Sequence, residues 1–236
     1  AISSVAGFFL ASAGAPSLAR LLLMLAGLSL VIASGCVWNN YIDRDIDAVM
    51  ERTKERAFVR HVVSVPFALA YASVLGLGGI AILYGFFNPL TAAVAFFGFV
   101  AYVVAYSLWG KRATPYGAHV GSVSGAVPPV VGYVACSGRL DLAALILFLM
   151  LVFWQMPHFF AIAMRRRDEY RAAGVPVLPL VRTGAQMPTL VIGYIVAFGL
   201  TSVLLWTAGY AGLWYLAGTL LLTLGWLVYA VRPIND

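Results

Sequence analysis

Charged side chains are scarce in this sequence. They make up 10% of the 236 residues, against 62% hydrophobic residues, and the mean hydropathy is +0.92. Soluble domains carry about 25% charged residues, so the composition excludes an ordinary soluble domain. Segments of alternating hydrophobicity are lacking as well, which excludes a membrane β-barrel. Apolar runs long enough to cross a bilayer recur instead, and they predict an all-α, polytopic transmembrane helical bundle.

Cysteines and polar linkers are also few. The two cysteines are Cys36 and Cys136, and we expect them near opposite faces of the bilayer, too far apart for a disulfide. No polar linker divides the chain, so we expect a single domain over residues 1–236. The chain starts without methionine inside an apolar run, and we expect the start of its first span to be missing.

Apolar stretches separated by turn signals predict eight spans. The pair Asn88-Pro89, for example, separates the third span from the fourth. In the fifth span glycines recur every fourth residue from 117 to 125, and the pair Pro128-Pro129 follows. The glycines indicate close helix packing, and the prolines must break or kink the helix. The expected spans cover residues 1–13, 20–40, 65–86, 89–108, 118–136, 140–164, 189–208 and 211–231.

Basic residues gather on one side of this predicted topology. The sequence holds fifteen lysines and arginines and nine acidic residues, a formal charge of +6. If the spans alternate in direction, all basic residues except Arg20 and Arg139 fall on one side, in three polar loops and at the end of the chain. The positive-inside rule makes that side cytoplasmic. Topology therefore accounts for much of the charge, and no nucleic-acid partner is expected.

The first polar loop carries a run of acidic residues directly after the second span. Asn39, Asp43 and Asp47 are spaced by four, so a continuing helix would present all three on one face. Carboxylates grouped in this way suit Mg²⁺, which uses one or two of them together with substrate phosphates. Arg52 and Lys54 follow as candidate diphosphate ligands. The alternative is a solvated acidic loop balanced by its own basic residues.

Two further segments on the same side contain candidate functional residues. Lys111 and Arg112 follow the fourth span and could neutralise diphosphate oxygens and stabilise a leaving group, or act only as a membrane anchor. His158 lies inside the sixth span, and Arg165 and Arg166 lie at its end. Imidazole is a common iron ligand and the arginines could bind a dianionic group. The alternatives are a packing histidine and a membrane boundary, and residues 174–180 are expected to form an extended flap.

These residues carry a resemblance to a known family. The run Asn39 to Asp47, followed by residues 51–56, resembles the first Asp-rich motif of the UbiA superfamily of intramembrane prenyltransferases. Within the superfamily, Asn39-Asn40 and residues 116–133, 154–158 and 175–180 resemble the branch that farnesylates haem. The resemblance implies a bundle of nine spans with a cavity open to lipid. About eight spans are present here, and we expect the last one to be missing.

The resemblance also implies an activity and a set of roles. The farnesyl group of farnesyl diphosphate would pass to a vinyl group of haem B, giving haem O. Asp43, Asp47 and Lys111 would be catalytic. The remaining roles follow by position: Mg²⁺ on Asn39, Asp43 and Asp47; diphosphate on Asn39, Arg52, Lys54, Lys111 and Arg112; haem on His158, Arg165 and Arg166.

The resemblance further places the active site on the cytoplasmic side of the inner (plasma) membrane, or in the mitochondrial inner membrane of a eukaryote. Haem A synthase or the terminal oxidase assembly are possible partners. Two alternatives stay open, a relative that prenylates a quinone or chlorin precursor and a membrane transporter, whose broken helices would carry similar features.

Overall fold

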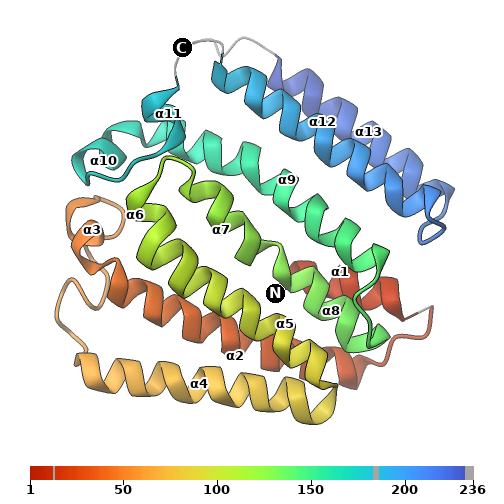
Figure 1. Cartoon of the computed structure of the whole chain (residues 1–236), viewed down its shortest axis with the longest axis horizontal. Helices are drawn as coiled ribbons and strands as arrows, with labels where there is room; N and C mark the ends of the chain where they lie inside the picture. Colours follow the sequence, from red (N-terminus) through yellow and green to blue (C-terminus); the bar gives the residue numbers. More distant parts are fainter. Residues whose placement is uncertain (13, 183–185, 232–236) are drawn as a thin grey trace.

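The structure is a computed structural model that describes residues 1–12, 14–182 and 186–231, and all regular elements within these ranges are helices (Figure 1). The prediction of an all-α fold is confirmed. In chain order the helices are α1 (Ile2–Ala11), α2 (Leu18–Ile42), α3 (Arg44–Val49), α4 (Val65–Phe86), α5 (Pro89–Val100), the π-helix η1 (Ala101–Gly110), α6 (Lys111–Ala113), α7 (Gly117–Gly125), α8 (Val127–Ser137), α9 (Leu142–Arg165), α10 (Arg167–Ala172), α11 (Leu178–Val181), α12 (Gln186–Thr207) and α13 (Leu213–Ala230).

Seven helical segments are long and apolar enough to cross a membrane. They coincide with the second to eighth predicted spans, and the expected first span is present as the short helix α1. The seven segments are Leu18–Ile42, Val65–Phe86, Pro89–Ala113, Gly117–Ser137, Leu142–Arg165, Gln186–Thr207 and Leu213–Ala230.

Close helix contacts in the bundle occur where glycines remove the side chain. A Cβ added to Gly79 of α4 would lie 2.5 Å from the carbonyl oxygen of Gly27 in α2. A Cβ added to Gly132 of α8 would lie within bonding distance of the carbonyl oxygen of Ser4 in α1. Because apolar side chains gain little from burial against each other in lipid, such backbone contacts stabilise helix pairs through close packing.

The fifth predicted span is broken, as its prolines require. α7 ends at Gly125, Ala126 caps it, and α8 begins with Pro128 and Pro129 in its first turn. Proline is tolerated there because the first amide groups of a helix have no intrahelical partner. The two halves still form one membrane-crossing segment, Gly117–Ser137.

The fourth span is longer than the sequence predicts. It was expected to end at residue 108, but α5 continues through the π-helix η1 into α6, and the segment ends at Ala113. Lys111 and Arg112 therefore lie on the last helical turn and not in a loop. π-Helical turns often mark functional sites, and this one leads directly to the basic pair.

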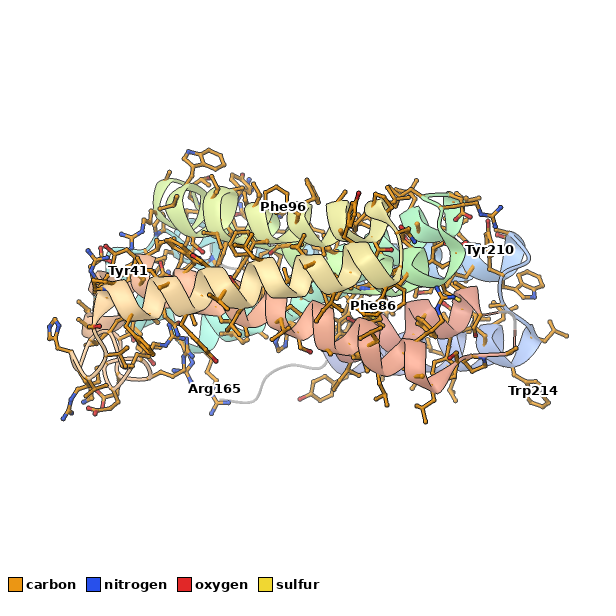
Figure 2. All side chains as sticks on the ribbon, turned by 90° about the horizontal axis from the view of Figure 1, so that it is seen from below. Tyr41, Phe86, Phe96, Arg165, Tyr210 and Trp214 are labelled. Carbon is orange, nitrogen blue, oxygen red and sulfur yellow. The ribbon has the colours of Figure 1, made fainter. Side chains whose placement is uncertain are left out.

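The polar connections gather at one end of the bundle. Helices α3, α6, α10 and α11 lie together at the left of Figure 1, which we call the basic end. Figure 2 places Tyr41 and Arg165 toward this end and Tyr210 and Trp214 at the other. The spans thus alternate in direction, as predicted, and the three basic loops meet.

Candidate active site

The three predicted metal ligands occupy the junction of α2 and α3. The Asp43 N–H donates to the Asn39 carbonyl oxygen and the Asp47 N–H to the Asp43 carbonyl oxygen, both at 2.8 Å. Helical hydrogen bonding therefore continues across the junction and keeps the three side chains on one face. All three residues are buried, with Asp43 fully enclosed.

Asp43 is held by groups from two helices. Lys111 Nζ lies 2.6 Å from its Oδ2, and the Asn39 amide donates to the same oxygen at 2.7 Å and to Ser107 Oγ at 2.9 Å. The other oxygen, Oδ1, is buried and makes no hydrogen bond, with Arg112 Nη2 3.5 Å away. A buried carboxylate oxygen without a hydrogen bond is costly, so this atom is suited to receive a cation at closer range.

Asp47 is paired with Arg56, which is not among the site residues predicted from the sequence. Arg56 Nη1 lies 2.6 Å from Asp47 Oδ2, and Thr53 Oγ1 donates to the Asp47 carbonyl oxygen at 3.2 Å. The loop after α3 therefore folds back onto the acidic face. No helical spacing relates Arg56 to Asp47, so sequence periodicity could not identify this pair.

Two predicted diphosphate ligands are engaged by carboxylates of the chain. Arg112 Nη2 lies 3.5 Å from Asp43 Oδ1. Arg112 makes two 2.7 Å hydrogen bonds to Asp45 and one to the Ile42 carbonyl oxygen. The hydrogen bond from Arg112 holds the pKa of the Asp45 carboxyl well below its usual value. Lys54 pairs with Glu51 on the exposed loop, 2.7 Å away. The structure does not bring Lys54 to the cavity described next, because the loop turns its side chain outward.

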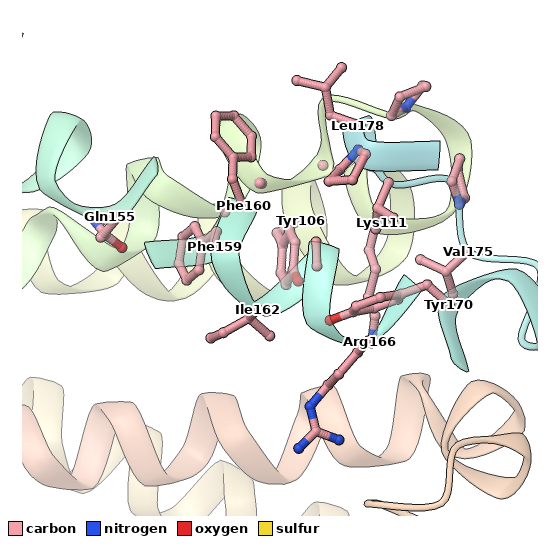
Figure 3. A pocket seen from close by; sticks show the side chains of 18 of the residues that line it. Tyr106, Lys111, Gln155, Phe159, Phe160, Ile162, Arg166, Tyr170, Val175 and Leu178 are labelled. Carbon is pink, nitrogen blue, oxygen red and sulfur yellow. The ribbon is translucent and has the colours of Figure 1, made fainter. Parts of the chain in front are cut away.

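A cavity of about 630 Å³ opens beside these residues, and we call it the central pocket (Figure 3). Its walls come from η1, α6, α7, α9 and α10, from the loop after α3 and from residues 175–179. Cationic side chains lie at the basic end, and aromatic and small residues line the interior. The residues that define it here are Arg52, Tyr102, Tyr106, Lys111, Gly121, Gly125, Gln155, Phe159, Phe160, Ile162, Arg165, Arg166, Tyr170 and Val175–Pro179.

The glycines of α7 shape this pocket. A Cβ on Gly121 would lie 3.0 Å from the Tyr106 ring, and one on Gly117 would lie 2.7 Å from the Gly110 carbonyl oxygen. α7 therefore packs directly on η1. The prediction that the glycines serve close packing is confirmed.

The predicted haem ligands are divided between two surfaces. Arg165 and Arg166 line the central pocket, and Arg166 Nη1 lies 3.1 Å from Glu169 Oε1. His158 does not line it: the ring is exposed on the outer face of α9 and stacks on Trp154, with centroids 5.7 Å apart. α9 continues through Pro157, so His158, three residues after Gln155, lies at the edge of the helix face that lines the pocket. Its ring turns outward onto Trp154.

Residues 174–180 were expected to form an extended flap, and this is correct in part. Val175 is buried against Ile46 and Met50 of the acidic segment, and residues 175–179 line the central pocket. Residues 178–181, however, form the single helical turn α11, with Pro179 in its first turn. Proline fits that position for the same reason as in α8.

The donor set fits a divalent metal shared with a substrate. Within the described ranges no three His, Cys, Asp or Glu side chains converge on one point, so a cage made of protein carboxylates is not present there. Mg²⁺ typically takes one or two carboxylates and completes its shell with phosphate oxygens. Asp43, Asp47 and the amide oxygen of Asn39 supply that minimal set.

Comparison with known proteins gives consistent matches. The UbiA prenyltransferase family matches residues 1–236. The chain is 50% identical over 230 residues to a protoheme IX farnesyltransferase of Aeromonas salmonicida, covering 98% of this chain and 78% of that protein. It is 48% identical over 231 residues to the protoheme IX farnesyltransferase of Yersinia enterocolitica, with the same coverage.

Solved structures match the fold. A UbiA homolog from Aeropyrum pernix superposes with a TM-score of 0.77 at 20% identity, covering 97% of this chain and 84% of that one. A UbiA homolog from Archaeoglobus fulgidus, bound to GPP and Mg²⁺, gives a TM-score of 0.75 at 15% identity, covering 97% and 80%. At these identities the likeness concerns the helical architecture.

Proposed function

Because the chain belongs to the UbiA prenyltransferase family, we propose that it transfers the farnesyl group of farnesyl diphosphate to a vinyl group of haem B, giving haem O. The observation that carries this proposal is the central pocket, which has cationic side chains at one end and an apolar interior; one of those cations, Lys111, pairs with the buried carboxylate of Asp43 behind the pocket wall. An allylic diphosphate has the same division into charged head and apolar tail. The names of the relatives about 50% identical to this chain support haem as the acceptor.

The diphosphate binds at the basic end. Lys111 and Arg52 line the pocket there, and Lys111 already touches Asp43. Asn39, Asp43 and Asp47 would hold Mg²⁺, which when bound neutralises diphosphate charge; the Archaeoglobus fulgidus homolog carries Mg²⁺ together with GPP. Arg112 donates hydrogen bonds to Asp45 and to the Ile42 carbonyl oxygen, and these bonds hold the end of α6 beside this site.

The residues of the chain then stabilise separation of charge. As the C1–O bond of the donor breaks, its electron pair leaves with the diphosphate, and Lys111 and Arg52 stabilise that growing negative charge. Tyr106, Phe159 and Phe160 line the apolar interior and keep water from the allylic cation. The vinyl π electrons of haem form the new C–C bond. Water adds to the resulting cation and loses a proton, which leaves a hydroxyl group.

Haem B approaches along α9 in this proposal. His158, Ile162 and Arg165 follow one another at intervals of four and three residues and are all exposed, so they share one face of the helix. An exposed imidazole inside an apolar span is costly in lipid and is a functional candidate by default. His158 would contact the iron, and Arg165 and Arg166 would pair with propionates.

The test supplies membranes with haem B and farnesyl diphosphate and separates the pigments afterwards. The wild type is expected to form haem O. Asp43→Asn should lower turnover by about 100- to 1000-fold, the usual effect of removing one preorganised charge contact. Asp168→Asn is the matched control, because Asp168 is 93% exposed and pairs with Arg171 outside the site. A prenylated quinone or chlorin without a haem product would contradict the proposal, as would full activity in a well-folded Asp43→Asn variant.

The alternatives fit the site less well. A transporter would carry charged groups near the middle of the membrane, whereas the ion pairs of this site lie at the basic end. We further propose that the basic end is cytoplasmic, in the inner (plasma) membrane of a bacterium or the mitochondrial inner membrane of a eukaryote. Association with haem A synthase or the terminal oxidase assembly stays a prediction.

A further inference from the structure

One polar side chain closes the central pocket at the end remote from the cations. Gln155 is 6% exposed, and its amide nitrogen donates to the carbonyl oxygens of Leu151 at 2.7 Å and Ser122 at 3.3 Å. The second bond joins α9 to α7. The amide is therefore fixed across the gap between the two helices that form the pocket.

Gly125 is the surface against which this amide packs. A Cβ added to Gly125 would lie within bonding distance of Gln155 Oε1 and 2.8 Å from its Cδ. The amide thus fills the space that any larger residue at position 125 would need. Together the two residues form the boundary of the pocket, and neither belongs to its charged end.

The distance between the two ends is set by α9. Arg165 follows Gln155 by ten residues on this helix, which corresponds to about 15 Å at the rise of an α-helix. Figure 3 shows Gln155 at one side of the pocket and Lys111, Tyr170 and Val175 at the other, with Phe159, Phe160 and Ile162 between them. An apolar chain anchored at the cations would therefore point toward Gln155.

We propose that Gln155, packed on Gly125, determines the length of the prenyl chain that the enzyme accepts. This inference rests on the proposed function. A chain longer by one isoprene unit would have to displace the amide from its two carbonyl partners. That leaves buried polar groups unpaired, which is unfavourable. A shorter chain would leave part of the apolar interior unfilled.

Two substitutions move the boundary in opposite directions. Gln155→Ala removes the amide and lengthens the pocket, whereas Gly125→Ala pushes the amide into the pocket and shortens it. Gln155→Met keeps the length of the side chain but removes its hydrogen bonds. It separates the effect of volume from that of the amide itself.

The experiment measures kcat/KM for geranyl, farnesyl and geranylgeranyl diphosphates with haem B. Gln155→Ala should raise the geranylgeranyl-to-farnesyl ratio, and Gly125→Ala the geranyl-to-farnesyl ratio, each by at least about 10-fold, the lower end of what one methylene contributes in an apolar pocket. Gln155→Met should raise the geranylgeranyl-to-farnesyl ratio by less than Gln155→Ala, because it fills the space of the amide but lacks the two hydrogen bonds that hold the amide in place. Ratios within one variant do not depend on how much of it folds.

Unchanged ratios in both boundary variants would overturn the inference, while haem farnesylation by the wild type would leave the proposed function intact. If the wild type prenylates no haem, the proposed function fails. Chain-length selection is then measured by binding. Each of the three diphosphates competes with radiolabelled farnesyl diphosphate for the protein in the presence of Mg²⁺, and the amount of label displaced gives their relative affinities. The same shifts in ratio support the inference there, and their absence overturns it.

Discussion

At the scale of residues, the site consists of buried carboxylates that each pair with a cation from another element. Asp43 pairs with Lys111 at the end of the fourth span, and Asp47 with Arg56 in the loop after α3, both at 2.6 Å. Removing one partner of a buried pair leaves a charge without compensation. These cations therefore support the fold of the acidic segment as well as the chemistry proposed for it.

Arg56→Gln should destabilise the protein, because Asp47 is 3% exposed and loses its ion partner. We expect the free energy of unfolding to fall by about 1.5–3 kcal/mol, the range for hydrogen bonds to charged groups. The fall stays within this range because the Arg56 side chain is partly exposed. Thermal unfolding in detergent measures it. Arg60→Gln is the control: its partner Glu55 is exposed, so the change should stay below about 1 kcal/mol. Equal shifts in the two variants would contradict the prediction.

His158→Ala should weaken haem B binding and leave farnesyl diphosphate binding unchanged. The ring is exposed on α9 and does not line the central pocket. Titration of the haem absorption band and a donor-binding assay measure the two affinities separately. His119→Ala is a matched control, because that ring is partly buried against Tyr194. Equal losses of both ligands in His158→Ala would argue for a structural role.

At the scale of elements, the bundle depends on where glycines let helix backbones meet. α2 and α4 approach at Gly27 and Gly79, and α1 and α8 at Gly7 and Gly132. The broken fifth span adds a second device, since its proline-started half packs on α1 and its glycine-rich half packs on η1. The glycine-rich half, α7, lines the site. The proline-started half, α8, anchors it in the bundle.

Gly79→Ala and its neighbour Gly78→Ala should have opposite effects on stability. A Cβ at Gly79 would meet the Gly27 carbonyl oxygen at 2.5 Å and Val31 at 2.8 Å, whereas one at Gly78 meets nothing within 4 Å. We expect Gly79→Ala to destabilise by about 1–3 kcal/mol, as overpacking does, and Gly78→Ala to stabilise by about 0.4–1 kcal/mol. Unfolding in detergent measures both. A Gly79→Ala variant as stable as Gly78→Ala would exclude tight backbone packing there.

At the scale of the whole molecule, the three basic loops share one end of the bundle (Figure 1), and cationic residues from that end line the central pocket. The resemblance to the UbiA superfamily is confirmed by the family match over residues 1–236 and by solved structures with the same helical architecture. The bundle is thus polarised, with most of its ionic groups at one end and apolar surface along its sides.

Labelling by a membrane-impermeant maleimide tests the orientation. In a background with Cys36 and Cys136 replaced by alanine, Glu55→Cys should react only after the membrane is opened to the cytoplasmic side. Arg139→Cys, at the opposite end and 75% exposed, should react in intact cells. The reverse pattern would place the basic end outside, against the positive-inside rule.

The sequence alone determined the helical class, the positions of seven spans and the shared face of Asn39, Asp43 and Asp47. These features depend on local hydropathy and on helical period, which neighbours along the chain encode. It also indicated the break at Pro128-Pro129, because proline acts on its own helix.

Only the tertiary structure decided how those segments face one another. The outward direction of His158, the Asp47–Arg56 pair, the outward turn of Lys54 and the closure of the pocket by Gln155 on Gly125 have no signal in the sequence. Helices that are apolar on all sides carry no amphipathic pattern, so the sequence does not state which face turns inward. Contacts between residues far apart in the chain make that choice, and they placed the buried carboxylates beside the cationic end of the central pocket.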